Sequence, residues 1–245
     1  MKPYFYAVHY AALAGYVIAA IHAVLAFVNK RRAAERTTLY AVAFAFLAHT
    51  AALILDWVRD GHYPLFSTTE ALSFLGWTLI VAYFLVTYRY PLRALGAFLL
   101  PVVTLLVLAS QLVSPNTAKD PSTVTDGSGS WLFPVHVTLL IFGYASFFVA
   151  FAASVMYLWQ ERELRLKKFS AVFHRLPSLT TVDDVASTAA SVGFTLLTWV
   201  VYLALLHYRV QWRGRKAAWL GVGGFTLVLC TFVGAVALGG FHVFR

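Results

Sequence analysis

Residues 49–77, HTAALILDWVRDGHYPLFSTTEALSFLGW, decide the fold of this chain because they join two apolar runs through a short polar segment. The stretch begins inside the first run at a histidine and enters the second run at Leu72. Ionisable residues gather at the end that the two runs share: Asp56, Arg59, Asp60, His62 and Glu70. An ionisable side chain inside an apolar membrane span is costly and usually functional. The stretch therefore predicts two neighbouring membrane helices with a functional site at one membrane face.

Composition places the whole chain in a membrane. Of its 245 residues, 60% are hydrophobic and 12% are charged, and its mean hydropathy is +0.74, which excludes a soluble domain. The apolar runs lack the alternation of barrel strands, and lipid cannot satisfy an open strand edge, so each run predicts a helix. We expect one all-α domain over residues 1–245, a polytopic transmembrane bundle of about seven helices. The seven stretches are 4–28, 37–57, 71–88, 94–113, 131–159, 185–208 and 217–243.

The basic residues set the expected orientation. The net charge is +9, but the basic residues sit in short loops between spans, which indicates membrane orientation and no nucleic-acid partner. The loop KRRAAER at 30–36 is then cytoplasmic and the N-terminus external. The first run is too long for a removable signal peptide and has no small-residue cleavage site. The single cysteine, Cys230, excludes a disulfide framework.

The loops alternate as this rule requires as far as 160–175, but the next basic loop breaks the pattern. RVQWRGRK at 209–216 should also be cytoplasmic, yet one apolar stretch, 185–208, separates the two loops. Three explanations remain open: a re-entrant or interfacial hairpin, an overridden orientation bias, or a lost crossing. The first half, 185–198, is weakly apolar and the second, 199–208, strongly apolar and aromatic, as in halves of two different helices.

Histidine is the residue type that stands out. Neutral imidazole is a common axial ligand of haem iron, so two facing histidines could hold one haem. His136 lies close below the interfacial Trp131, and His242 ends the last span in GGFHVFR, which suggests an outer pair. Either one is equally explained as a polar residue at the interface. The eight histidines are His9, His22, His49, His62, His136, His174, His207 and His242.

A second candidate pair lies deeper. His49 falls near the middle of its span, whereas His207, two residues before Arg209, is a ligand candidate or a side chain that reaches toward the headgroups. Glu70 is either a capping carboxylate or a group that orients a ligand histidine. Trp77 fits an aromatic belt at the membrane interface as well as a platform for haem. His9 and His22 lack a supporting motif and read as packing or interfacial residues.

At these residues the chain resembles the CcsA/HemX-like cytochrome c assembly family. The segment 61–77 is similar to the family's GHFPLSNLYESLxFLxW external segment. Residues 131–168 resemble its first external histidine helix with a charged exit, and 212–242 its last helix with the second external histidine. The similarity covers most of the chain from about residue 37 onward.

The resemblance implies sites, cofactor and partners. His136 and His242 would be ligands of an external haem, and His49 and His207 of a second haem b inside the membrane. The implied function is haem binding and transmembrane haem delivery for cytochrome c maturation, as part of a haem-attachment system. Implied partners are haem, apocytochrome c, a second assembly subunit and membrane lipid, in a bacterial-type cytoplasmic (inner) membrane.

An alternative function stays open beside it. The stand-alone size of the chain also fits a HemX-like membrane regulator or scaffold of haem biosynthesis, which catalyses nothing. A small-solute transporter is disfavoured because no inverted repeat is evident.

The chain departs from the family at one place. The family has a tryptophan-rich external loop with a WGxYWxWDPKE-like core between two helices, for a pattern of eight. Here the flanking pieces abut as GFTLLTWVVYLALLH at 193–207. We expect that the chain lacks the outer half of one helix, the loop and the outer half of the next helix, where the orientation count also fails.

Overall fold

The structure of the chain is a computed structural model. It describes residues 3–29, 32–61, 67–90, 94–112, 132–167 and 176–211, with the single positions 63, 65, 92, 173, 222, 223, 226 and 230.

The described residues form helices and no strand. Each of the six helices is long and apolar enough to cross a membrane, which confirms the expected all-α, polytopic membrane fold. The seventh expected span, 217–243, lies almost entirely outside the described residues. The helices are α1 (Pro3–Asn29), α2 (Arg32–Asp60), α3 (Thr68–Arg89), α4 (Leu95–Leu112), α5 (Leu132–Arg165) and α6 (Leu179–Gln211).

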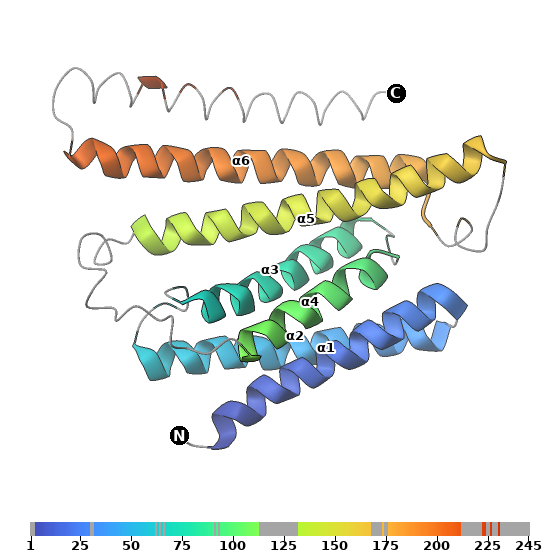
Figure 1. Ribbon diagram of the computed structural model, residues 1–245, viewed down its shortest axis with the longest axis horizontal. Helices are drawn as coiled ribbons and strands as arrows, with labels where there is room; N and C mark the ends of the chain where they lie inside the picture. The colour runs from blue at the N-terminus through green and yellow to red at the C-terminus, as the bar shows by residue number, and fades with distance from the viewer. Residues whose placement is uncertain are drawn as a thin grey trace.

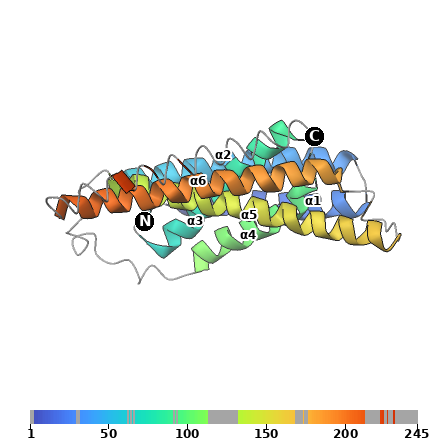
Figure 2. The same ribbon diagram turned by 90° about the horizontal axis from the view of Figure 1, so that it is seen from above.

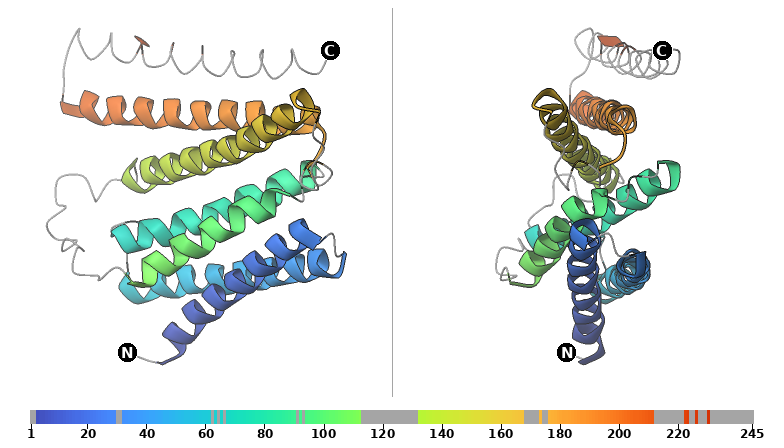
Figure 3. Two further views of the ribbon diagram at one scale, coloured as in Figure 1. Left: turned by 45° about the vertical axis from the view of Figure 1, so that its right-hand side comes forward. Right: turned by 90° about the vertical axis from the view of Figure 1, so that its right-hand side faces the viewer.

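The helices lie in three antiparallel pairs. The pair α3 and α4 lies between the pair α1 and α2 and the pair α5 and α6 (Figure 1, Figure 3). Helix α4 packs on α1 and helix α3 on α5, so the central pair holds the two outer pairs together. Seen from above, α5 and α6 follow the long dimension of the bundle (Figure 2). The buried core therefore runs through the central pair and reaches both of its neighbours.

Helix α3 begins at a capping box in the sequence STTE. The backbone N–H of Glu70 donates to Ser67 Oγ at 3.2 Å, and the Ser67 N–H donates to Glu70 Oε2 at 3.4 Å. The two bonds satisfy donors that the first turn of a helix leaves free. The predicted capping role of Glu70 is confirmed, and it fixes where the chain re-enters the bundle after α2.

Helices α1 and α2 approach each other closely because a glycine faces an alanine. A Cβ atom on Gly15 would stand 2.8 Å from the Cβ of Ala45, which is closer than real Cβ atoms come. Small residues let membrane helices pack at short distance. This approach brings the side chains on either side of Gly15 within reach of α2.

Helix α6 rules out one of the three explanations for the single apolar stretch between two basic loops. Residues 185–208 form no hairpin, because they belong to one uninterrupted helix, Leu179–Gln211. It packs antiparallel to α5, where Cβ atoms on Gly143 and Gly193 would stand 2.9 Å from Leu197 and 3.0 Å from Phe147. One crossing therefore carries the chain from the end of α5 back to the level where α5 begins.

Candidate functional site

His49 lies where three helices meet. Its side chain on α2 is only 1% exposed. Its Nδ1 forms a hydrogen bond of 3.2 Å with the Tyr16 hydroxyl of α1, and its Nε2 one of 2.9 Å with the Ser73 hydroxyl of α3. A buried polar group is costly unless it is paired. Because both ring nitrogens are paired, His49 fixes α1, α2 and α3 in one arrangement.

Tyr16 is itself fixed from several sides. It is fully buried, and its ring meets the His49 ring edge-on, with 5.6 Å between centroids and 76° between planes. The Thr104 hydroxyl of α4 donates to the Tyr16 backbone carbonyl at 3.2 Å and to the Leu100 carbonyl at 2.8 Å. A fourth helix therefore supports the residue that pairs with Nδ1.

Trp77 forms an aromatic wall beside this network. Its indole ring stacks on Phe46 at 5.5 Å and 18°, and on Phe74 at 5.5 Å and 24°. Its N–H donates to Thr50 Oγ1 at 2.9 Å. Thr50 follows His49 in α2, and Phe74 follows Ser73 in α3. Trp77 is therefore packed between α2 and α3, which is a different position from the interfacial belt that its sequence also fitted.

The aromatic contacts continue toward the end of α2. Phe74 meets Tyr63 with 6.3 Å between ring centroids, and Tyr63 meets Trp57 with 5.9 Å. Tyr63 also shares a hydrogen bond of 3.1 Å with Thr138 Oγ1, which ties this end to α5. Trp57 is 52% exposed and keeps a belt-like position. A row of rings thus leads from the membrane face to the neighbourhood of His49.

Asp56, Arg59 and Asp60 form a cluster at the end of α2, as the sequence predicted, while the predicted member Glu70 takes part in the cap of α3. His9 Nε2 lies 2.9 Å from Asp56 Oδ2, and an Arg59 guanidinium nitrogen lies 3.2 Å from Asp56 Oδ1. Arg59 also pairs with Asp60 at 2.6 Å. His9 was not among the predicted members, because no motif around it distinguishes it. The predicted member His62 lies outside the described residues.

The cluster and the His49 network belong to one seam. His9 and Tyr16 are seven residues apart on α1, and Asp56 and His49 are seven apart on α2. Seven residues are about two helical turns, so each pair of residues lies on one face of its helix. The seam between α1 and α2 therefore carries two polar layers, one at the membrane face and one in the interior.

Tyr16 and Ser73 are the partners that sequence reasoning missed. The one signal for Tyr16 was its spacing from His9, which only becomes informative once the register of α1 against α2 is known. Ser73 lies inside the 61–77 motif, at a position where the family pattern accepts any residue, so the motif does not distinguish it.

His136 and His207 are not brought to the level of His49. His136 lies half-buried near the start of α5. Residue 193 faces 147 and residue 197 faces 143, so the same register places the backbone of His207 opposite residue 133. Ile141, in one cluster with Phe74, faces residue 199 in that register. The backbone of His207 therefore lies about 12 Å nearer the start of α5 than the level of Ile141. His242 and Trp131 lie outside the described residues.

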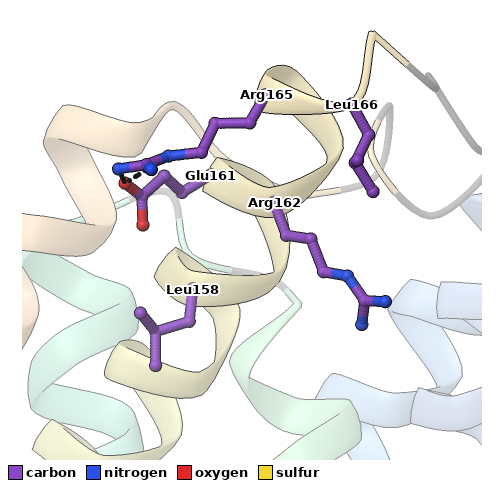
Figure 4. Close-up of a pocket in the computed structure, with 5 residues that line it drawn as sticks. All are labelled: Leu158, Glu161, Arg162, Arg165 and Leu166. Atoms are coloured by element: carbon purple, nitrogen blue, oxygen red, sulfur yellow. Dashed lines mark hydrogen bonds and ion pairs between the residues drawn. The ribbon is translucent and has the colours of Figure 1, made fainter.

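A shallow pocket lies at the opposite end of α5. An ion pair of 2.6 Å joins Arg165 to Glu161, while the Arg162 side chain points to the other side (Figure 4). This end belongs to the basic loop predicted to face the cytoplasm, and it is remote from His136. The pocket is lined by Leu158, Glu161, Arg162, Arg165 and Leu166.

Comparison with known proteins identifies relatives of the chain. Residues 65–198, more than half of the chain, match the family described as "Cytochrome C assembly protein". The protein named cytochrome c biogenesis protein CcsA of Prochlorococcus marinus (strain MIT 9303) is 26% identical, with 82% of this chain and 81% of that protein covered. The CcsA of Synechococcus sp. (strain RCC307) is 25% identical, with 86% of each chain covered. The CcsA of Guillardia theta is 24% identical over 81% of this chain and 82% of that protein. No solved structure matches the chain.

Two details of these matches bear on the expected missing segment. The family match ends at Thr198, the last residue before the two pieces of α6 abut. The alignment to the Prochlorococcus protein extends over 260 positions, more than the 245 residues of this chain, so the relative has residues that this chain lacks. An external loop after residue 198 would turn the second piece back into the membrane. Without such a loop, α6 continues in the same direction and carries the backbone of His207 toward the level where α5 begins.

Proposed function

Because this chain belongs to the cytochrome c assembly protein family, we propose that it binds haem in the membrane and delivers it across the membrane for cytochrome c maturation. The observation that carries the proposal is the buried His49, held between three helices beside the aromatic wall of Trp77. An ionisable residue at this depth is a functional candidate by default.

The residues present have the chemistry that haem needs. An imidazole nitrogen is a ligand of haem iron, and a metal-bound histidine usually has a partner on its other ring nitrogen. The Tyr16 hydroxyl occupies that partner position on Nδ1. The stacked rings of Phe46, Trp77 and Phe74 give the ligand an apolar surrounding. When bound, haem supplies the redox chemistry and is itself the group that becomes attached to the apocytochrome. The chain holds, orients and shields the haem.

The remaining assignments form part of the same proposal. His136 would hold a haem at the external side, and His207 would be a further ligand. Because α6 crosses only once, a span over 217–243 would end on the other side, so His242 would join His136 only if the lost crossing were present. Glu70 and Trp77 would belong to the haem surroundings. The chain would lie in a bacterial-type cytoplasmic membrane with its N-terminus external, receive haem b, and pass it to apocytochrome c beside a second assembly subunit. The relatives named CcsA support this direction because they match most of the chain.

The decisive measurement is a reduced-minus-oxidised absorption spectrum of purified protein in nanodiscs, with a pyridine haemochrome assay for haem type and stoichiometry. We expect a b-type spectrum that weakens in His49→Gln. His22→Gln is the control, because His22 is a histidine in another membrane span, where it is half-buried. No haem in folded, monodisperse wild-type protein would refute haem binding. Equal haem in the His49 and His22 variants would remove His49 from the site.

One observation favours a second candidate function. Helix α6 is uninterrupted over 193–207, where the family pattern has its tryptophan-rich loop, so a loop that would cradle an external haem is missing from this place. A membrane regulator of haem biosynthesis would not need that loop. The two functions separate in a deletion strain: His136→Ala abolishes covalent cytochrome c formation under the first, and under the second changes haem-precursor levels with cytochrome c unaffected.

A further inference from the structure

The two hydroxyl groups that hold His49 differ in how firmly they are fixed. Tyr16 is fully buried, packs edge-on against the imidazole and is supported through its backbone by Thr104. Ser73 is a helical serine whose hydroxyl rotates about one bond. A helical serine can instead donate to the carbonyl four residues earlier, as Ser146 and Ser154 do in this protein at 2.9 and 2.8 Å. Ser73 has an alternative partner of this kind in the Thr69 carbonyl, whereas the hydroxyl of a tyrosine is too far from its own helix backbone to make such a bond.

The chemistry of neutral imidazole connects the firmer fixation of Tyr16, compared with Ser73, to iron binding. One ring nitrogen carries the proton and the other a lone pair, and iron can bind only at the lone pair. When Nδ1–H donates to the Tyr16 oxygen, the Ser73 hydroxyl donates to Nε2. In that tautomer the serine proton occupies the direction in which iron would approach. For iron to reach this nitrogen, the Ser73 hydroxyl would rotate and the turn of α3 that carries it would move away from His49, while Tyr16 continues to hold the orientation of the imidazole.

We propose that Tyr16 is the positioning residue for His49, that Nε2 is the nitrogen offered to haem iron, and that the Ser73 hydroxyl protects it until iron displaces it. The assignment rests on the proposed haem binding. To the proposed haem site it adds Tyr16 and Ser73, and it places the approach of the iron on the α3 side of His49.

The same arrangement explains how the haem-free protein avoids a buried, unpaired imidazole. Leaving a buried nitrogen without a partner costs more than a made hydrogen bond contributes. Ser73 satisfies Nε2 before haem arrives and finds a partner within its own helix afterwards. The two hydroxyls therefore have opposite effects on haem affinity: Ser73 competes with iron, and Tyr16 supports it.

The test titrates haemin into full-length protein in nanodiscs and records haemin affinity and the haem reduction potential. Ser73→Ala is expected to raise haemin affinity about three- to fivefold, since the competing hydrogen bond is lost from the haem-free state only. Tyr16→Phe is expected to lower haemin affinity about tenfold and to raise the reduction potential, because the imidazole loses the partner that increases its basicity. Thr78→Val and Tyr83→Phe are the matched controls, a buried hydroxyl bonded within α3 and a second buried tyrosine.

Melting of the haem-free protein provides a second readout. Both Tyr16→Phe and Ser73→Ala should lower the melting temperature more than their controls, which shows that the loss of each partner is felt before haem binds. A variant that melts like its control would contradict the hydrogen bond on which the proposal stands.

The outcomes separate haem binding at His49 from the roles assigned to Tyr16 and Ser73. Wild-type protein that binds no haemin, or binds it equally after His49→Gln, overturns the proposed function at His49 and the assignment with it. Binding that depends on His49 but is the same in Tyr16→Phe and Tyr83→Phe overturns the assignment alone. Opposite signs, with Tyr16→Phe binding more tightly and Ser73→Ala more weakly, would make Nδ1 the coordinating nitrogen and also overturn it.

Discussion

Gly15 of α1 and Ala45 of α2 leave no room for another carbon between them, since a Cβ on Gly15 would stand 2.8 Å from the Cβ and 3.2 Å from the Cα of Ala45. The contact is next in sequence to Tyr16, so the spacing of the two helices also sets the distance from Tyr16 to His49. Packing at one residue thereby controls the geometry of the buried polar network.

Gly15→Ala should therefore destabilise the protein. The added methyl group meets a helix backbone that cannot move aside cheaply, and overpacking of this kind costs about 1–3 kcal/mol. Gly76→Ala is the graded comparison, because its new carbon would stand 3.0 Å from a side-chain methyl group of Val107 and 3.8 Å from its next neighbours, with no backbone atom closer than that. Thermal unfolding in nanodiscs measures both variants. Equal melting temperatures for the two would contradict the close approach at Gly15.

Replacement of Trp77 should separate its hydrogen bond from its ring stacking. Trp77→Phe keeps a ring between Phe46 and Phe74 and loses only the donor to Thr50, at a cost of about 1 kcal/mol. Trp77→Leu also loses two stacked aromatic pairs, each contributing about 0.5–1.5 kcal/mol, and should melt lower still. Trp57→Phe, at an exposed ring, should change the unfolding free energy by less than about 0.5 kcal/mol. A larger effect at Trp57 than at Trp77 would refute the packed position of Trp77.

The start of α3 offers a test of the two roles considered for Glu70. Ser67→Ala removes the cap and should cost about 1 kcal/mol, compared with a small change for Ser154→Ala inside α5. Glu70→Gln retains the reciprocal bond of a capping box and should melt like the wild type. A shifted haem spectrum in Glu70→Gln with unchanged stability would show that its charge, rather than its capping bond, acts on the haem site.

The single crossing of α6 can be tested with cysteine labelling. In a Cys230→Ser background, Ser67→Cys and Gln211→Cys should react with a membrane-impermeant maleimide from one side, and Ser178→Cys from the other. The ends of α6 lie at opposite ends of one uninterrupted helix, which is the reason for this expectation. Labelling of Gln211→Cys together with Ser178→Cys would instead indicate that residues 185–208 turn back within the membrane. The side that labels Ser67→Cys also tests whether the N-terminus is external.

The helices were predictable because long apolar runs leave few alternatives in lipid. Expected spans such as 4–28 and 71–88 correspond to α1 and α3 with small shifts at their ends. The cluster around Asp56 and Arg59 followed from charge alone, since costly residues gather where a span ends.

The partners of His49 could not be predicted, because they depend on how separate helices are set against each other. Tyr16 and Ser73 lie 33 and 24 residues from His49 along the chain, and apolar periodicity carries no information on that register. Loop charges also could not decide the path of 185–208. The loop charges showed that two basic loops are separated by a single apolar stretch. Only the continuous helix shows that this stretch does not form a hairpin.

Helix α1 has a consequence for any attempt to isolate a smaller working unit. The stretch common to the family, residues 65–198, contains Ser73 but neither His49 nor Tyr16. Expressed by itself, it would present the α3 serine to lipid and lack the imidazole altogether. The first two helices are thus an integral half of the buried network, and the shortest fragment worth purifying starts before His9.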